Sequence, residues 1–240
     1  MYIEHKGINI FFTDEGQGNA VVLLHGFLEN TSMWEPFTPI LLRTNRVITI
    51  DLLGHGKTGC LGYVHSMELM AEIVHVVLKH LKIKQSIIIG HSMGGYVALA
   101  FAEKHPGMLR GLCLMNSTPN PDNFEKKKKR DRAILAVKQS HKTFIMMAIG
   151  NLFSPKNRTI FSDKIKTLIA DAKKTPPQGT IAALQGMKIR KYRQALYNSA
   201  PYKKILIISK IYFVVFAIIY YTRFFYFCFY CKNNNNAILN

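Results

Sequence analysis

The sequence predicts an α/β protein with a doubly wound, mostly parallel sheet and one helical insertion, and three observations support this. Four short apolar runs that end in turn residues are continuous rather than alternating, as in strands covered by helices on both faces. They lie at 21–24, 47–50, 87–89 and 112–115. Helical patterns separate the runs, and strand-like runs are absent between about 119 and 196. Alternating strands and helices favour a parallel sheet that binds ligands beyond the carboxyl ends of its strands.

Two helices between the runs are predicted from their periodicity. Ser66 can cap a helix whose apolar residues recur at three- and four-residue spacing from Met67 to Leu81. A second helix is expected from Gly94 towards Lys104, because Pro106 cannot continue it.

The 240 residues divide into four predicted parts. Residues 1–118 form the first part of the core, and 119–200 form a helical cap with helices at 124–148, 163–173 and 179–190. The apolar run in 201–209 returns the chain to the sheet. Residues 210–240 form an aberrant tail rich in aromatic residues.

The net charge of +18 does not indicate a nucleic-acid partner. Twelve of the fourteen acidic residues lie before position 132, so the excess comes from the basic run 126–130 and an acid-free C-terminal part. Aromatic and basic residues do not interleave as they do on a nucleic-acid-binding fold. We interpret the run 126–130 as a solvated helix face.

The four cysteines fit neither a disulfide framework nor a zinc site. Cys60 and Cys113 are far apart, and Cys228 and Cys231 have no second pair or histidine nearby. All four are predicted to be reduced thiols in a cytoplasmic protein, with no metal and no cofactor. The first nine residues lack the pattern of a signal peptide.

The motif with the clearest chemical meaning is the G-x-S-x-G sequence at 90–94, which follows an apolar run and precedes a helix. On such a turn Ser92 is expected in a strained strand-to-helix bend with its hydroxyl exposed. Gly90 and Gly94 flank it because side chains would collide there. The backbone N–H of Met93, at the helix N-terminus, is an expected oxyanion donor.

Together with two further motifs, the elbow makes residues 1–209 resemble the α/β-hydrolase superfamily, in particular its capped serine esterase and cofactor-free peroxidase branch. His25-Gly26-Phe27 follows one predicted strand, and the sequence 51–58 follows the next. The resemblance implies an α/β-hydrolase fold with a helical cap, and a small ester or acyl substrate attacked by Ser92. It also implies the backbone N–H of Phe27 as the second oxyanion donor.

Other residues near the expected site have two interpretations. His25, Gly26, Trp34 and His91 border the expected pocket. Trp34 lines an acyl pocket or anchors the core, whereas His91 packs against the sheet and His25 holds a loop by hydrogen bonds. Asp51 and His55 are expected to be turn residues. Asp122 is a candidate triad acid, because some superfamily members take their acid shortly after this strand.

A working triad needs a base that accepts the serine proton and an acid that orients the base. The family order is serine, acid, histidine, yet no carboxylate follows Asp171 and no histidine follows His141, which lies in the cap. The expected continuation is replaced by an aromatic stretch. We interpret 210–240 as a frameshift or read-through product that leaves the fold C-terminally truncated.

Three function hypotheses follow. The first is a serine hydrolase of small ester or acyl substrates whose activity is impaired. The second is a catalytically inactive remnant. The third is a membrane-associated binding protein anchored through 205–231, although Lys210 and Arg223 interrupt that apolar stretch. Ser92 argues against epoxide-hydrolase and dehalogenase chemistry, which uses an aspartate there, whereas lyases and C–C hydrolases use the same serine.

Overall fold

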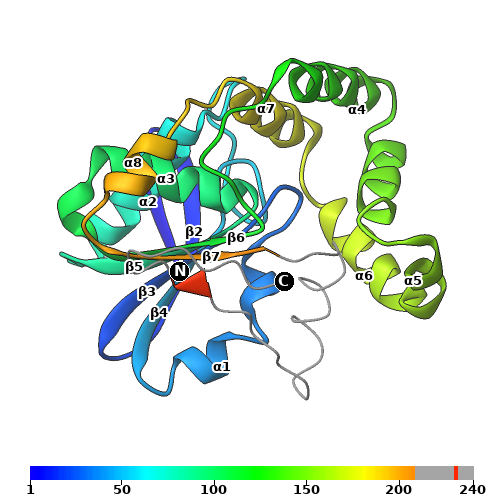
Figure 1. Cartoon of the computed structure of the whole chain (residues 1–240). Coiled ribbons are helices and arrows are strands. Elements are labelled where there is room, and N and C mark those ends of the chain that lie inside the picture. Colours follow the sequence, from blue (N-terminus) through cyan, green and yellow to red (C-terminus); the bar gives the residue numbers. More distant parts are fainter. Residues whose placement is uncertain (209–229, 232–240) are drawn as a thin grey trace.

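The computed structural model describes residues 1–208 and 230–231. A mixed sheet lies between helices on its two faces (Figure 1), which confirms the predicted fold class. Its eight strands run in the order β1-β2-β4-β3-β5-β6-β7-β8. They are β1 (Tyr2–His5), β2 (Ile8–Gly16), β3 (Asn19–Leu24), β4 (Asn45–Ile50), β5 (Ser86–His91), β6 (Leu109–Met115), β7 (Lys203–Ile207) and β8 (Tyr230–Cys231).

The predicted apolar runs are confirmed as the parallel centre of the sheet. β4, β3, β5, β6 and β7 are paired in parallel in that order. Leu24 pairs with both Ile50 and Gly90 at the carboxyl ends of their strands. The His-Gly-Phe turn, the 51–58 loop and the G-x-S-x-G turn therefore leave the sheet at the same edge.

The first sixteen residues form a hairpin that the sequence analysis did not predict. β1 pairs antiparallel with β2, and β2 pairs antiparallel with β4. Lys6 and Gly7 between the strands have φ of 53° and 77°, which suits the tight turns that match strand twist. Ile10 and Phe12 alternate inward and are fully buried. This alternation was the available sequence signal.

Helices cover the two sheet faces unequally. Shorter helical elements are η1 (Thr31–Trp34), η2 (Pro106–Met108) and α1 (Thr38–Leu41). The two predicted core helices are confirmed as α2 (Met67–His80), capped by the Ser66 hydroxyl, and α3 (Met93–Lys104). In Figure 1 these two lie together on one face, where they build the larger hydrophobic core, and α1 lies on the other.

Between residues 119 and 200 the described secondary structure is helical. It contains α4 (Phe124–Gly150), α5 (Pro155–Ile160), α6 (Ser162–Ala172), α7 (Pro177–Lys188) and α8 (Gln194–Ser199). Extended backbone angles at Ser140 divide α4 into two parts. In Figure 1, α4, α5 and α6 stand away from the sheet, whereas α8 lies beside α3. Leu196 and Tyr197 of α8 pack against the core, so the end of this segment belongs to the sheet layers rather than to a cap.

Two predictions about surfaces have different outcomes. Lys126 to Lys129 are exposed as expected, but Arg130 is half-buried because it pairs with Asp122. The described part of the expected membrane segment 205–231 contains no helix: Ile205 to Ile207 belong to β7, Ile208 lies outside regular secondary structure, and Tyr230 and Cys231 form β8. Residues 209–229 lie outside the described residues. No helix among the residues described here is long and apolar enough to cross a membrane.

Candidate functional site

The site is built on the turn between β5 and α3, where Ser92 has φ 48° and ψ −109°. A positive φ is strained for a residue with a Cβ and points to a tightly constrained turn. The turn is held by the Ser92 N–H, which donates to the Met115 carbonyl at 2.8 Å, and by the Ser117 hydroxyl, which donates to the Ser92 carbonyl at 2.8 Å. Ser92 is half-buried, and its hydroxyl has no hydrogen-bond partner among the described residues.

Glycines surround the turn because backbone atoms occupy the space of a side chain. A Cβ on Gly90 would collide with the backbone of Gly94, and a Cβ on Gly94 would collide with the Leu24 carbonyl oxygen. At Gly95 the obstacle is a side chain, since a Cβ there would meet the Ser117 side chain. The steric reason expected for the two motif glycines is therefore present.

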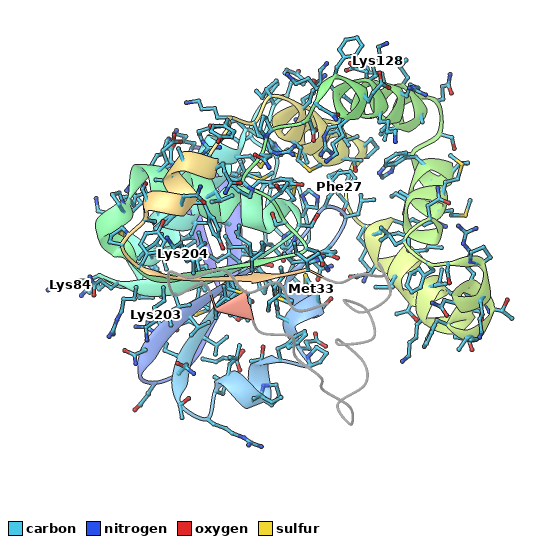
Figure 2. All side chains as sticks on the ribbon, viewed as in Figure 1. Phe27, Met33, Lys84, Lys128, Lys203 and Lys204 are labelled. Carbon is cyan, nitrogen blue, oxygen red and sulfur yellow. The ribbon has the colours of Figure 1, made fainter. Side chains whose placement is uncertain are left out.

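The His-Gly-Phe turn after β3 faces the same edge. Figure 2 shows Phe27 on the side of the helical segment, whereas Lys84 and Lys203, at the opposite ends of the parallel strands, lie away from it. Leu28 follows with φ 62°, and the Glu29 N–H donates to the Gly26 carbonyl at 3.3 Å. Among the described residues, neither the N–H of Phe27 nor that of Met93 has an intramolecular acceptor.

Glu29 and His91 form a buried pair that the sequence analysis missed. Glu29 Oε2 accepts hydrogen bonds from the Gly26 N–H at 2.6 Å and from His91 Nδ1 at 2.8 Å, with the two side chains 11% and 10% exposed. Burial raises the pKa of the Glu29 carboxyl, but the charge and hydrogen bond of His91 and the Gly26 N–H outweigh it and lower that pKa overall. The available sequence signal was a glutamate three residues after a turn glycine.

The other predicted turn residues hold loops. His25 donates from Nδ1 to the Gly26 carbonyl at 2.8 Å, and its Nε2 accepts from the Leu52 N–H at 2.9 Å. Because Nε2 accepts a hydrogen bond, the ring is neutral, in agreement with burial lowering the pKa of His25. Asp51 accepts from the N–H groups of Thr31 and Lys57, both at 2.8 Å.

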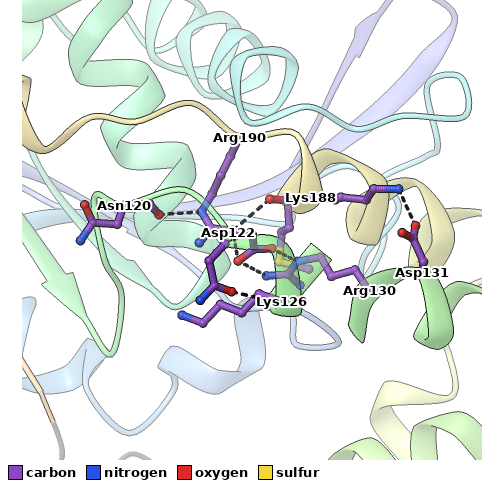
Figure 3. Close-up of polar contacts among 9 residues, drawn as sticks. Asn120, Asp122, Lys126, Arg130, Asp131, Lys188 and Arg190 are labelled. Carbon is purple, nitrogen blue, oxygen red and sulfur yellow. Dashed lines mark hydrogen bonds and ion pairs between the residues drawn. The ribbon is translucent and has the colours of Figure 1, made fainter. Parts of the chain in front are cut away.

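Asp122 is almost fully buried and paired with two arginines (Figure 3). Arg130 near the start of α4 donates from Nε to Asp122 Oδ2 and from Nη2 to Oδ1 at 3.5 Å, and Nη1 of Arg190, after α7, lies 2.7 Å from Oδ1. Arg190 also lies 4.1 Å from the centre of the Tyr96 ring. No described histidine hydrogen-bonds to Asp122. Its ion pairs join the start of α4 to the residue after α7, and Arg190 in turn contacts α3 through Tyr96.

Trp34 is 2% exposed and packs with Val21, Leu23 and Val47 on the face that carries α1. This placement favours the core-anchor interpretation over the acyl-pocket one. A cavity of about 320 Å³ lies nearby, lined by Leu28, Glu29, Ile149 of α4 and several residues of α6, among others.

The described histidines provide no partner for Ser92. His141 contacts the Thr180 hydroxyl at 3.1 Å within the helical segment. His55 is fully buried, and burial lowers its pKa to about 3. Within the described residues no cluster of histidine, cysteine, aspartate or glutamate could hold a metal ion.

Comparison with known proteins agrees with this fold. A family model for the alpha/beta hydrolase fold matches residues 19–141, just over half of the chain. A solved structure of a thermophilic esterase from Thermogutta terrifontis, with malate bound, is 31% identical and superimposes with a TM-score of 0.78 over 85% of this chain and 76% of that one.

The chain belongs to the alpha/beta hydrolase fold family. Two curated members of this family align over about half of the chain. The bifunctional epoxide hydrolase 2 of Rattus norvegicus is 33% identical over 50% of this chain and 22% of its own length. The 2-hydroxy-6-oxo-6-(2'-aminophenyl)hexa-2,4-dienoic acid hydrolase of Metapseudomonas resinovorans is 30% identical over 48% of this chain and 41% of its own length. The alignments thus span less than half of either relative.

Proposed function

We propose that this alpha/beta hydrolase acts on small ester or acyl substrates with Ser92 as its nucleophile. The backbone of Ser92 carries the proposal: φ of 48° and ψ of −109° on a turn where Gly90 and Gly94 leave no room for side chains. Such a turn presents the hydroxyl beyond the sheet edge, where a carbonyl carbon can approach it.

Two backbone N–H groups support acyl chemistry at this hydroxyl. Those of Phe27 and Met93 have no acceptor within the described part of the chain, and each follows a conformationally restricted turn. Donors of this kind stabilise the negative charge that develops on a carbonyl oxygen, and removing one typically costs about 10²–10³ in rate. The α3 N-terminus at Met93 adds a partial positive charge.

The proposed chemistry is limited because Ser92 has no histidine base among the described residues. Within the given sequence no histidine follows His141, and no described histidine contacts Ser92. Loss of the triad histidine costs about 10⁶ in turnover, while the oxyanion hole and binding leave about 10³–10⁴ over water. We therefore propose that the 240-residue chain reacts through Ser92 slowly.

The helical segment from residue 119 to the end of α7 is proposed to form a cap, whereas α8 packs against the core.

A fluorophosphonate probe tests the proposal, because an activated serine hydroxyl attacks its phosphorus, displaces fluoride and becomes phosphonylated. The 240-residue chain and Ser92→Ala are incubated with the probe and mapped by mass spectrometry, and hydrolysis of p-nitrophenyl acetate is measured in parallel. Slow labelling at Ser92 that the variant abolishes supports the proposal. Labelling no faster than that of Ser117, whose hydroxyl hydrogen-bonds to the Ser92 carbonyl, would refute it and leave an inactive remnant.

A further inference from the structure

We propose that Glu29 is a positioning residue that sets the separation between the two oxyanion donors. This inference rests on the proposed function, because it takes the N–H groups of Phe27 and Met93 as those donors. Its basis is one carboxylate oxygen that accepts from the Gly26 N–H at 2.6 Å and from His91 Nδ1 at 2.8 Å.

The two residues that Glu29 joins lie one and two positions before the residues that carry the two donors. Gly26 is one residue before Phe27, and His91 is two residues before Met93. The ladder between β3 and β5 ends at the pair Leu24 and Gly90. Beyond that pair the two segments share no ladder hydrogen bonds, and the Glu29 carboxylate connects them through Gly26 and His91.

The surroundings of the carboxylate fit this role. A Cβ on Gly26 would lie 2.8 Å from His91 Nδ1 and even closer to the Glu29 carboxylate. Gly26 therefore has to be glycine for the pair to approach the backbone this closely. Charge-assisted hydrogen bonds are about twice as strong as neutral ones, so this contact restrains both segments more firmly than a neutral contact would.

The consequence concerns rate rather than fold. Donors are effective when they lie about 2.7–3.1 Å from the developing oxyanion, and small misplacements reduce the reaction rate strongly. A glutamine keeps an oxygen that can accept from both Gly26 and His91 but carries no negative charge, whereas alanine keeps no acceptor. Glu29→Ala should therefore disturb both donor positions, and Glu29→Gln should restore part of the arrangement.

The first readout does not depend on activity. Amide spectra of the ¹⁵N-labelled 240-residue chain are compared for Glu29→Ala, Glu29→Gln and the control Asp14→Asn, which removes a carboxylate from the Asp14–Arg46 ion pair between β2 and β4. We expect the signals of both Phe27 and Met93 to move in Glu29→Ala, to return partly in Glu29→Gln and to stay in place in the control. Changes confined to Gly26 and His91 would overturn the proposal.

The second readout is the fluorophosphonate labelling rate of variants that keep the native fluorescence of Trp34. We expect Glu29→Ala to be labelled at least about tenfold more slowly and Glu29→Gln to recover much of the rate. An unchanged rate in folded Glu29→Ala would overturn the positioning role while the proposed function stands. Absence of labelling in the parent chain refutes the proposed function alone, and the amide signals of Phe27 and Met93 then decide the role of Glu29.

Discussion

Replacing Asp122 by asparagine is expected to destabilise the protein, because it leaves a buried cation without its counter-charge. The Asp122 side chain is 1% exposed and that of Arg190 3%, with 2.7 Å between their charged atoms. Asparagine has a similar shape but carries no charge. The change therefore tests electrostatics rather than packing.

The expected loss in free energy of unfolding depends on which arginine stays buried without its carboxylate partner. Breaking a buried ion pair by removing one partner costs about 3–5 kcal/mol. Arg190 keeps the carbonyl oxygens of Met187 and Asn120, at 2.9 and 3.1 Å, and Arg130 is 19% exposed and can turn to water. We therefore expect a loss near the lower limit, about 3 kcal/mol, or about 6–12 °C in Tm for a domain of this size.

Urea unfolding followed by Trp34 fluorescence measures this loss, since Trp34 is the single tryptophan and is 2% exposed. Asp163→Asn is the control, because Asp163 also pairs with a basic residue but is 89% exposed. Its effect should stay within about 0.5 kcal/mol. A loss below about 1 kcal/mol in Asp122→Asn at pH 7 would refute the reasoning.

The same pair gives a pH dependence. Burial raises the pKa of Asp122, but the hydrogen bonds and charges of Arg130 and Arg190 lower it below its ordinary 3.8 overall. A carboxyl whose pKa is lower in the folded state stabilises the fold fully above pH 3.8, and this is lost as pH falls below that value. The difference between parent and Asp122→Asn should therefore shrink below pH 4, and a gap independent of pH would contradict this.

Three further predictions follow from other contacts. Gly94→Val should abolish both native fluorescence and labelling, because its side chain collides with the Leu24 carbonyl; a folded, reactive variant would contradict the proposed turn geometry. Cys113, whose pKa burial raises to about 12, should resist a thiol reagent at pH 8 until urea unfolds the chain, whereas half-buried Cys60 should react sooner; equal rates would contradict this placement. Arg193→Ala should cost about 2 kcal/mol in urea unfolding, less than Asp122→Asn, because the two carboxylates that it leaves are partly exposed; an equal or larger loss would contradict this order.

Much of the fold was readable because buried parallel strands have few alternatives. The four apolar runs all lie inside strands of one sheet, at 21–24, 47–50, 87–89 and 112–115. Apolar runs of that length between helices have to be covered on both faces. The hairpin of β1 and β2 was missed because it pairs antiparallel at a sheet edge and alternates in burial. Alternation in so short a segment is a weaker signal than a continuous run.

The placement of α8 shows another limit of periodicity. The pattern after Pro119 predicts helices but not the layer in which each one packs. Arg193 decides this at the start of α8, since its guanidinium pairs with Glu68 of α2 at 2.6 Å and Glu103 of α3 at 2.7 Å. Partners that are 125 and 90 residues away in sequence cannot be inferred from a local pattern.

The sequence by itself determined the family and the turn that carries Ser92, because glycines at 90 and 94 and the apolar run before them are local steric requirements. Only the tertiary structure decided the contacts of Asp122, Trp34 and Glu29. Each of these side chains is defined by a partner brought close by folding: an arginine after α7, the far face of the sheet, and the imidazole of His91. Charge pairing and burial act over distances in space, and a single sequence records only distances along the chain.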